Sequence, residues 1–292
     1  MVTTAPSYPG AEAQYTGPMG RLSRTMQLAR ASWEILKADR ELLILPLLSL
    51  LATLVVAASF LVPVIHAGRD AGPSNPGPVG GALIFAAYLL LAFITIFFNA
   101  ALVHAANQRL QGGDPTVRSA LAGASRRVGR ILPWALLSAT VSMILRAIQE
   151  RGGIVGKIVS GIAGIAWSLV TFMVVPVLVI ENVGVGEALR RSSAMFRKTW
   201  GENVAAQVGF GLLGFLLVLP AIAVIALAFA VGATVGAFML IAGVLWILLV
   251  LMVLSALSGI FQTALYRYAS GNAQAVGAFS APDLQAAFAP KR

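Results

Sequence analysis

Long apolar runs separated by short polar segments occupy the chain from about residue 42 to residue 266. The longest run lies between Glu202 and Arg267, where 64 consecutive residues carry no charge. A helix needs roughly 20 apolar residues to cross the hydrocarbon core of a bilayer, so this run is long enough for two crossings. The pattern therefore predicts an all-α polytopic membrane helix bundle.

The apolar runs predict six transmembrane helices, at Leu42–Ile65, Ala82–Ala106, Ile131–Ile148, Ile158–Ile180, Val204–Val231 and Phe238–Tyr266. The third span is the weakest, because its uncharged run stops before Arg146, whose side chain must reach an interface. Pro176 and Pro220 predict kinks in spans four and five. The Pro- and Gly-rich segment after span one predicts a structureless turn.

A basic segment between spans four and five, Glu187–Val204, has a helical pattern with two distinct faces. Leu189, Ser193, Phe196 and Trp200 share one face, and the basic residues lie on the other. Such a helix directly before a span is typical of an interfacial helix lying among lipid headgroups.

Similar segments precede spans one and three, and a common spacing of Leu, Ser and a basic residue recurs in all three. The positions are Leu28-Ser32-Lys37, Leu121-Ser125-Arg130 and Leu189-Ser193-Lys198. This spacing predicts a three-fold repeat, in which each unit has one cytoplasmic amphipathic helix followed by a helical hairpin.

The distribution of basic residues predicts the orientation of the spans in the membrane. The chain has a net charge of +10, and of its 21 Lys and Arg residues 17 fall on one side of the predicted spans and four on the other. Positively charged loops stay in the cytoplasm, so both termini are predicted to be cytoplasmic in a multi-pass protein of the cell membrane. The expected partners are anionic lipid headgroups, with a protein partner or a homo-oligomer also possible and no nucleic acid. The candidate lipid- or partner-facing residues are Arg190, Arg191, Arg197, Lys198, Trp200 and Trp33.

The ends of the chain are expected to lie outside the membrane domain. Residues 1–20 read as a disordered tail without signal-peptide features, and Met19 could be an alternative start to Met1. Residues 21–268 form the predicted six-span domain. Residues 269–292 form a cytoplasmic tail, in which Ser280 could cap a short docking helix.

Candidate chemistry is sparse. The chain has no cysteine, and its two histidines, His66 and His104, are predicted at opposite ends of the membrane. We therefore expect no catalytic residue, metal site or cofactor, and no enzyme activity. The candidate intramembrane polar residues are Asn99, Ser142, Arg146 and Gln262. They could either form hydrogen bonds between helices or line a polar path, and Arg146 could pair with Glu150.

Three stretches of the sequence resemble a known protein family. They are VPVLVIENVGVGEALRRSSAMFRKTWGE, NAALVHAANQRLQGGDPTV and FQTALYRYASG. Together they resemble an uncharacterised bacterial family of six-span membrane proteins, of a type common in actinobacteria, over nearly the whole chain from Arg21. The membrane architecture is also similar to the membrane domain of glycerophosphodiester phosphodiesterases. The catalytic barrel of those enzymes is absent, so the resemblance implies a non-catalytic integral membrane module.

Two functions follow from these patterns. The first is a non-enzymatic, lipid-associated scaffold or accessory subunit of the cell envelope. The alternative is a transporter of a small solute or lipid. A polar cavity lined by Asn99, Ser142 and Gln262 would favour transport, and a bundle centre filled with Leu, Phe and Val would favour the scaffold.

Overall fold

The computed structural model describes residues 32–37, 39, 41–71 and 77–270 and is helical throughout, without a β-strand in those ranges. Residues 32–37 form a short helical segment. The elements that follow are α2 (Glu41–Ala71), α3 (Gly77–Leu110), α4 (Val117–Ser125), α5 (Val128–Arg151), α6 (Gly153–Thr171), α7 (Val174–Pro176), the π-helical turn η1 (Val177–Glu181), α8 (Val185–Ala228) and α9 (Ala233–Ala269). The predicted N-terminal tail, with Met19, lies outside the described residues, as do residues 271–292 of the predicted C-terminal tail, with Ser280; α9 reaches Ala269, the first residue of that tail.

Six segments are long and apolar enough to cross a membrane, which agrees with the predicted number of spans and marks the chain as a multi-pass membrane protein. Their bounds differ from the predicted ones at every span, and the difference matters most in the first loop. Helix α2 continues to Ala71 and α3 begins at Gly77, so both helices extend into the segment that the Pro and Gly content predicted as a turn.

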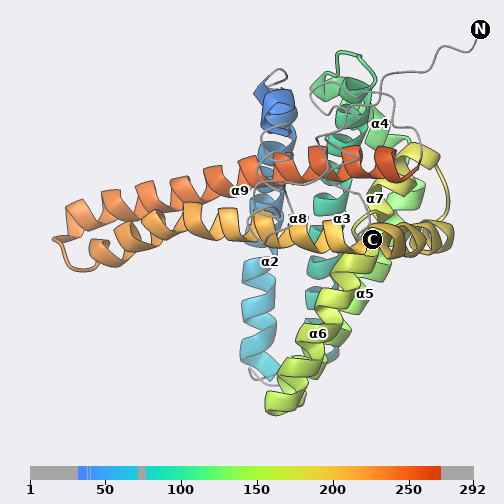
Figure 1. Cartoon of the computed structure of the whole chain (residues 1–292). Helices are drawn as coiled ribbons and strands as arrows, with labels where there is room; N and C mark the ends of the chain where they lie inside the picture. The colour runs from blue at the N-terminus through green and yellow to red at the C-terminus, as the bar shows by residue number, and fades with distance from the viewer. Residues whose placement is uncertain (1–31, 38, 40, 72–76, 271–292) are drawn as a thin grey trace, which may run out of the picture.

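The six segments do not form one parallel bundle. Helices α2, α3, α5 and α6 run alongside one another, whereas α8 and α9 form a hairpin that crosses them and extends beyond them (Figure 1). The cause is that α8 is a single helix of 44 residues from Val185 to Ala228. The sequence predicted an interfacial helix that turns into a separate span, and an unbroken helix cannot make that turn.

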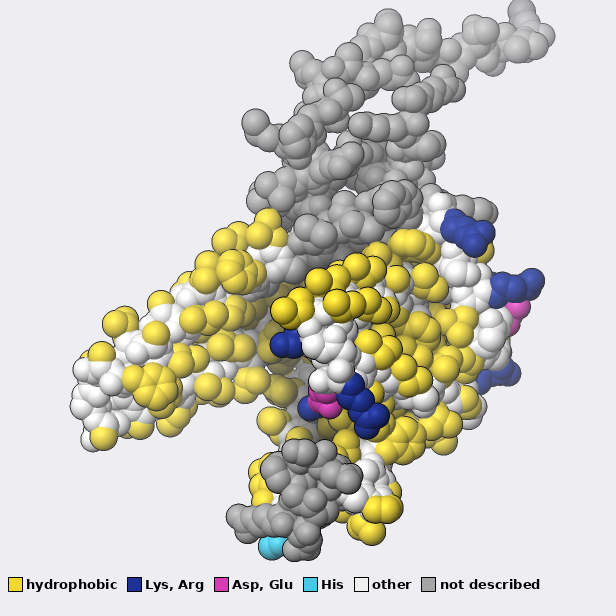
Figure 2. Space-filling model, turned by 90° about the horizontal axis from the view of Figure 1, so that it is seen from below, with side chains coloured by type: hydrophobic (Ala, Val, Ile, Leu, Met, Phe, Trp, Pro, Cys, Tyr) yellow, Lys and Arg dark blue, Asp and Glu magenta, His cyan; other side chains and the backbone are white. Residues whose placement is uncertain are grey.

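Small residues let α8 and α9 pack closely in the hairpin, and the outer surface of the hairpin is apolar. A Cβ atom on Gly243 of α9 would lie 2.5 Å from Cγ1 of Ile225 and 3.3 Å from the backbone oxygen of Ala221, both on α8. The indole Nε1 of Trp246 donates to the backbone oxygen of Leu217 over 2.8 Å. Figure 2 shows hydrophobic side chains along the extending hairpin, which is the surface expected against lipid.

The fourth span, in which Pro176 predicted a kink, is interrupted one turn before that proline, and side chains from two other helices bond the carbonyls left there. Helix α6 ends at Thr171, and the chain continues through α7 and η1 to Asn182, which has a left-handed φ of 55°. Two side chains donate to carbonyl oxygens freed at the end of α6. The Ser192 hydroxyl of α8 donates to Val170, and the Gln262 amide of α9 donates to Phe172.

The most buried side chains gather toward one end of the structure, where α2 begins, α3 ends and α4 lies; we call this the α4 end. They come from the second half of α3, from α7 and η1, and from the second half of α9. Val103 and Ile260 are fully buried there. Close approach of the elements depends on glycine, because a Cβ on Gly123 of α4 would lie 2.3 Å from the His104 ring of α3.

The predicted three-fold repeat is not reproduced as three equal units. Helix α4 is separated from α5 by Arg126 and Arg127, whereas the corresponding segment of α8 continues directly into the apolar part. The serines matched by the repeat also differ in burial, since Ser32 is buried, Ser193 half-buried and Ser125 exposed. The partners Leu28 and Lys198 lie outside the described side chains.

The start of α2 is tied to α4 by an acidic side chain. The Glu41 carboxylate accepts a hydrogen bond of 2.9 Å from the backbone N–H of Val117, in the first turn of α4, where a negative charge is favourable. Nearby, Asp39 is 7% exposed. Burial raises the pKa of the Asp39 carboxyl above its ordinary value, and the charge of Arg109 offsets part of this rise.

The closeness of α8 and α9 predicts a difference between two glycine variants. Gly243→Val should push the helices apart and destabilise the protein by about 1–3 kcal/mol, the usual effect of overpacking. Gly211→Val is the control, because a Cβ there meets nothing within 4 Å. Thermal unfolding in one detergent measures both, and equal midpoints for the two variants would contradict the packing argument.

The buried carboxyl predicts a pH effect. Because the folded protein raises the pKa of Asp39, its ionisation destabilises the fold, and this destabilisation develops as the pH rises through the folded pKa. Asp39→Asn should therefore raise the unfolding midpoint near neutral pH, and the gain should vanish at about pH 3 and below, where the carboxyl is protonated in both states. A gain that persists unchanged in acid would refute this explanation.

Candidate functional site

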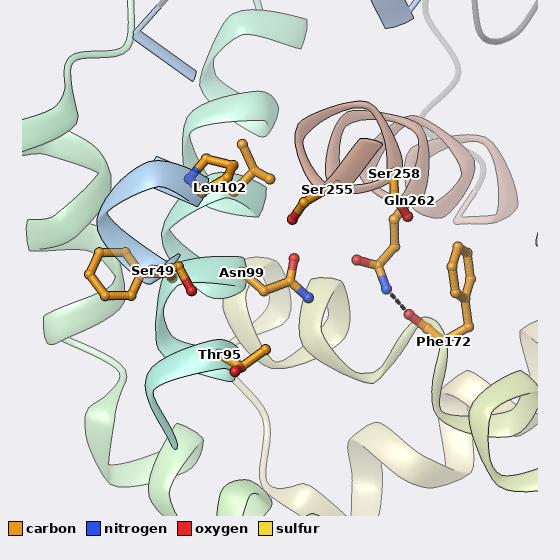
Figure 3. Close-up of a pocket in the computed structure, with 11 residues that line it drawn as sticks. Ser49, Thr95, Asn99, Leu102, Phe172, Ser255, Ser258 and Gln262 are labelled. Carbon is orange, nitrogen blue, oxygen red and sulfur yellow. Dashed lines mark hydrogen bonds between the residues drawn. The ribbon is translucent and has the colours of Figure 1, made fainter. Parts of the chain in front are cut away.

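A polar cavity lies where α9 crosses α2 and α3, with a volume of about 320 Å³. We call it the crossing cavity. Figure 3 shows Asn99 of α3 pointing across it toward Ser255 and Gln262 of α9. Its lining residues are Pro46, Ser49, Thr95, Phe98, Asn99, Leu102, Phe172, Ser255, Ser258, Gly259 and Gln262, none of which is charged.

Two side-chain amides line this cavity in different states. Gln262 is 7% exposed, and its Nε2 donates to the backbone oxygen of Phe172, which fixes the amide. Asn99 has no hydrogen-bond partner among the residues that the structure describes, and neither do the hydroxyls of Ser255 and Ser258. Thr95, by contrast, donates to the backbone oxygen of Leu91 over 2.9 Å. Among the described residues, the cavity thus presents one amide and three hydroxyls without a hydrogen-bond partner, the third hydroxyl being that of Ser49.

The cavity is closed on one side and open on the other. On α3 the chain continues from the lining toward the α4 end through Val103, and on α9 Ile260 and Phe261 lie between the lining residues Gly259 and Gln262. Val103 and Ile260 are fully buried, and Phe261 is 2% exposed. Thr95 lies one turn from Asn99 in the opposite direction along α3 and is exposed, as is Ser255 on α9. Entry to the cavity is therefore on the side away from the α4 end.

The position of the cavity along α3 places it deep in the apolar region. Asn99 precedes the last residue of α3, Leu110, by 11 residues. At 1.5 Å per residue the separation is about 16 Å, roughly half the thickness of a bilayer core. An amide at this depth is far from bulk water, so a water molecule or a ligand that bonds it would stabilise it.

The structure brings together two of the four predicted intramembrane polar residues, Asn99 and Gln262. Ser142 does not join them, because it is exposed on α5. Arg146 lies apart from the cavity as well. Its Nε donates to Glu150 over 2.7 Å, as the four-residue spacing predicted, and its guanidinium donates to the Tyr88 hydroxyl.

Part of the lining was not among the residues that the sequence pattern predicted. Ser49 and Pro46 lie in span one, and Phe172 lies at the break after α6. A lone serine in an apolar run was the available signal for Ser49. Nothing in the local sequence indicated that α2 would meet α9 at this point, since that contact depends on the crossing hairpin.

The basic segment at the start of α8 is held by carboxylates. Glu187 accepts from Arg190 at 2.9 Å and from Arg191 at 2.6 Å, and Arg191 also pairs with Glu181. The hydrogen bonds from Arg190 lower the pKa of Glu187. Glu181 in turn accepts a hydrogen bond of 2.7 Å from the hydroxyl of Tyr266 on α9. These contacts attach the segment to η1 and α9.

The other predicted lipid- or partner-facing residues have mixed surroundings. Arg197 is exposed and has no charged partner in the described part of the chain. Trp33 is 40% exposed, with the Lys37 ammonium 5.8 Å from its ring centroid. Lys198 and Trp200 lie in a stretch of α8 whose side chains are outside the description.

No group of three or more His, Asp or Glu side chains that could hold a metal ion occurs in the described ranges. His66 lies near the far end of α2 and His104 near the α4 end of α3, so the two histidines do not meet.

Comparison with known proteins identifies the family. The model of a family of unknown function, DUF6159, matches residues 79–276, which is more than half of the chain. The chain belongs to this family. The DUF6159 match begins within α3 and includes the Asn99 and Gln262 positions of the crossing cavity. No curated protein and no solved structure matches the chain. The resemblance to the membrane domain of glycerophosphodiester phosphodiesterases stays a prediction.

The Glu181–Tyr266 hydrogen bond predicts that two tyrosine variants will lose different amounts of stability. Tyr266 is 4% exposed and bonds a carboxylate that is itself largely buried, so Tyr266→Phe should destabilise the protein by about 1.5–3 kcal/mol. Tyr88→Phe removes a hydrogen bond to Arg146, whose side chain is 59% exposed, and should lose less than about 1 kcal/mol. Thermal unfolding midpoints of the two variants, measured in the same detergent, test this difference. A larger loss of stability for Tyr88→Phe than for Tyr266→Phe would contradict it.

Proposed function

We propose that this protein is a non-enzymatic membrane protein that binds a small polar molecule, or the polar part of a lipid, in the crossing cavity. Binding there would be a step in moving the ligand within or across the membrane. The observation that carries the proposal is the set of free polar groups, the Asn99 amide and the hydroxyls of Ser255 and Ser258, at membrane depth. Polar groups without partners are unfavourable in the apolar region of a membrane, so a ligand that bonds them would be stabilised.

The cavity also fits binding better than a purely structural role. A cavity of about 320 Å³ is at the lower end of the range found for small-molecule sites. Polar side chains that served only to join helices would bond one another, as Gln262 bonds the end of α6. Asn99 makes no such bond within the described structure. The charge-free lining favours facilitated movement over coupling to protons, because proton coupling usually requires an ionisable group within the membrane.

A scaffold or accessory subunit is the second candidate. The exposed side chains of Arg197 and Trp33 favour it, since a base and an indole at a membrane surface suit anionic headgroups or a protein partner. In either role we propose that the protein lies in the cell membrane with the α4 end and both termini in the cytoplasm, as the distribution of Lys and Arg indicates.

The test is native mass spectrometry of protein extracted from membranes with minimal delipidation. The wild-type protein should retain a stoichiometric non-covalent ligand. Asn99→Leu should retain at least about tenfold less, which corresponds to the loss of roughly 1.4 kcal/mol of binding free energy. Ser142→Leu is the matched control, because it removes an exposed polar group outside the cavity, and its ligand content should equal that of wild type.

Equal ligand content in all three proteins would reject the cavity as the binding site. A protein partner that co-purifies with wild type and with Asn99→Leu, but is lost in Arg197→Ala, would favour the scaffold instead. The measured mass also reports any homo-oligomer.

A further inference from the structure

We propose that the ligand of the crossing cavity is an uncharged, hydroxyl-bearing lipid, such as a glycerolipid or lipid alcohol without a charged headgroup, which enters from the bilayer. This inference rests on the proposed function and specifies its ligand. It follows from the charge of the lining, its hydrogen-bonding capacity and the apolar surface at the entrance.

The lining excludes a charged ligand. Among the described residues around the cavity there is no Asp, Glu, Lys, Arg or His. An ion at the depth of Asn99 would lose its hydration without gaining a counter-charge, and this loss is far larger than a few hydrogen bonds can offset. The nearest basic side chain further along α9, Arg267, is directed to Asn107, to whose side-chain oxygen it donates over 3.1 Å.

The free groups match hydroxyls. The Asn99 amide has two donors and one acceptor, and each serine hydroxyl both donates and accepts. The Gln262 amide uses a donor on Phe172 and keeps its oxygen available, turned toward the cavity in Figure 3. A ligand hydroxyl also donates and accepts, so two or three hydroxyls could satisfy Asn99, Ser255 and Ser258 together.

The entrance is apolar. Leu251 precedes Ser255 by one turn on α9 and is 54% exposed. Leu91 precedes Thr95 by one turn on α3 and is half-exposed. Because α9 crosses α3, the two leucines lie in different directions from the cavity, and each places apolar surface beside a lining residue (Figure 1). A ligand with a polar end and an apolar chain fits this change in polarity, because its chain would cover the leucines while its hydroxyls occupy the cavity.

The test uses purified wild-type protein in phosphatidylcholine nanodiscs with three added compounds. Dioleoylglycerol carries a hydroxyl and no charge, dioleoyl phosphatidic acid carries the same chains with a charged headgroup, and free glycerol lacks the chains. Native mass spectrometry measures occupancy for wild type, Asn99→Leu and the Ser142→Leu control. Asn99→Asp, nearly isosteric, adds a charge to the cavity.

Dioleoylglycerol should bind wild type and Ser142→Leu at up to one molecule per chain, with at least about tenfold lower occupancy in Asn99→Leu and Asn99→Asp. Phosphatidic acid should not compete. Asn99-dependent binding of free glycerol in place of dioleoylglycerol would uphold the hydroxyl ligand and overturn its source in the bilayer. Asn99-dependent binding of phosphatidic acid in preference to dioleoylglycerol would overturn the uncharged ligand.

The two proposals fail in different ways. If protein from native membranes retains an Asn99-dependent ligand but none of the three compounds binds, the ligand class is wrong and the cavity remains the site. If neither experiment finds binding that depends on Asn99, both proposals are overturned.

Discussion

The arrangement of this protein depends on how the carbonyl groups at the end of α6 are satisfied. A helix that stops inside the apolar region leaves backbone carbonyls without partners, and a bilayer offers no water to replace them. Here Ser192 and Gln262 donate to the carbonyls of Val170 and Phe172. These two side chains come from different helices, so satisfying the break fixes the positions of both α8 and α9 relative to α6.

The same contacts account for the polar cavity. Because Gln262 is held at the end of α6, the part of α9 that carries Ser255 and Ser258 faces Asn99 of α3 and Ser49 of α2. Small residues allow close contact on the closed side, where a Cβ on Gly259 would lie 2.4 Å from a methyl carbon of Leu102. On the open side none of the side chains that the structure describes bonds Asn99. The cavity is thus a consequence of a crossing contact rather than of a pore along a parallel bundle.

The basic segment of α8 shows how a pattern visible in the sequence acquires a second role in three dimensions. Arg190 and Arg191 are exposed, as their helical face predicts, yet both bond Glu187, and Arg191 also reaches Glu181 at the end of η1. Carboxylate pairing reduces the charge that these two residues present to a lipid surface. Arg197 remains the more available base, and the attachment of the segment to η1 and α9 stabilises the crossing.

The sequence by itself determined the class of protein, the number of apolar segments, the interruption near Pro176 and the Arg146–Glu150 pair. These features depend on residues close together in the chain, where apolar length, proline geometry and helical spacing act directly. It also identified Asn99 and Gln262 as polar residues that need an explanation. The tertiary structure alone decided that these two meet while Ser142 does not, and that α8 continues without a bend across the other helices. Those outcomes depend on contacts between residues far apart in sequence, such as Gln262 with Phe172. Hydropathy does not indicate which apolar helix packs against which, because lipid and apolar side chains are equally favourable neighbours of an apolar helix.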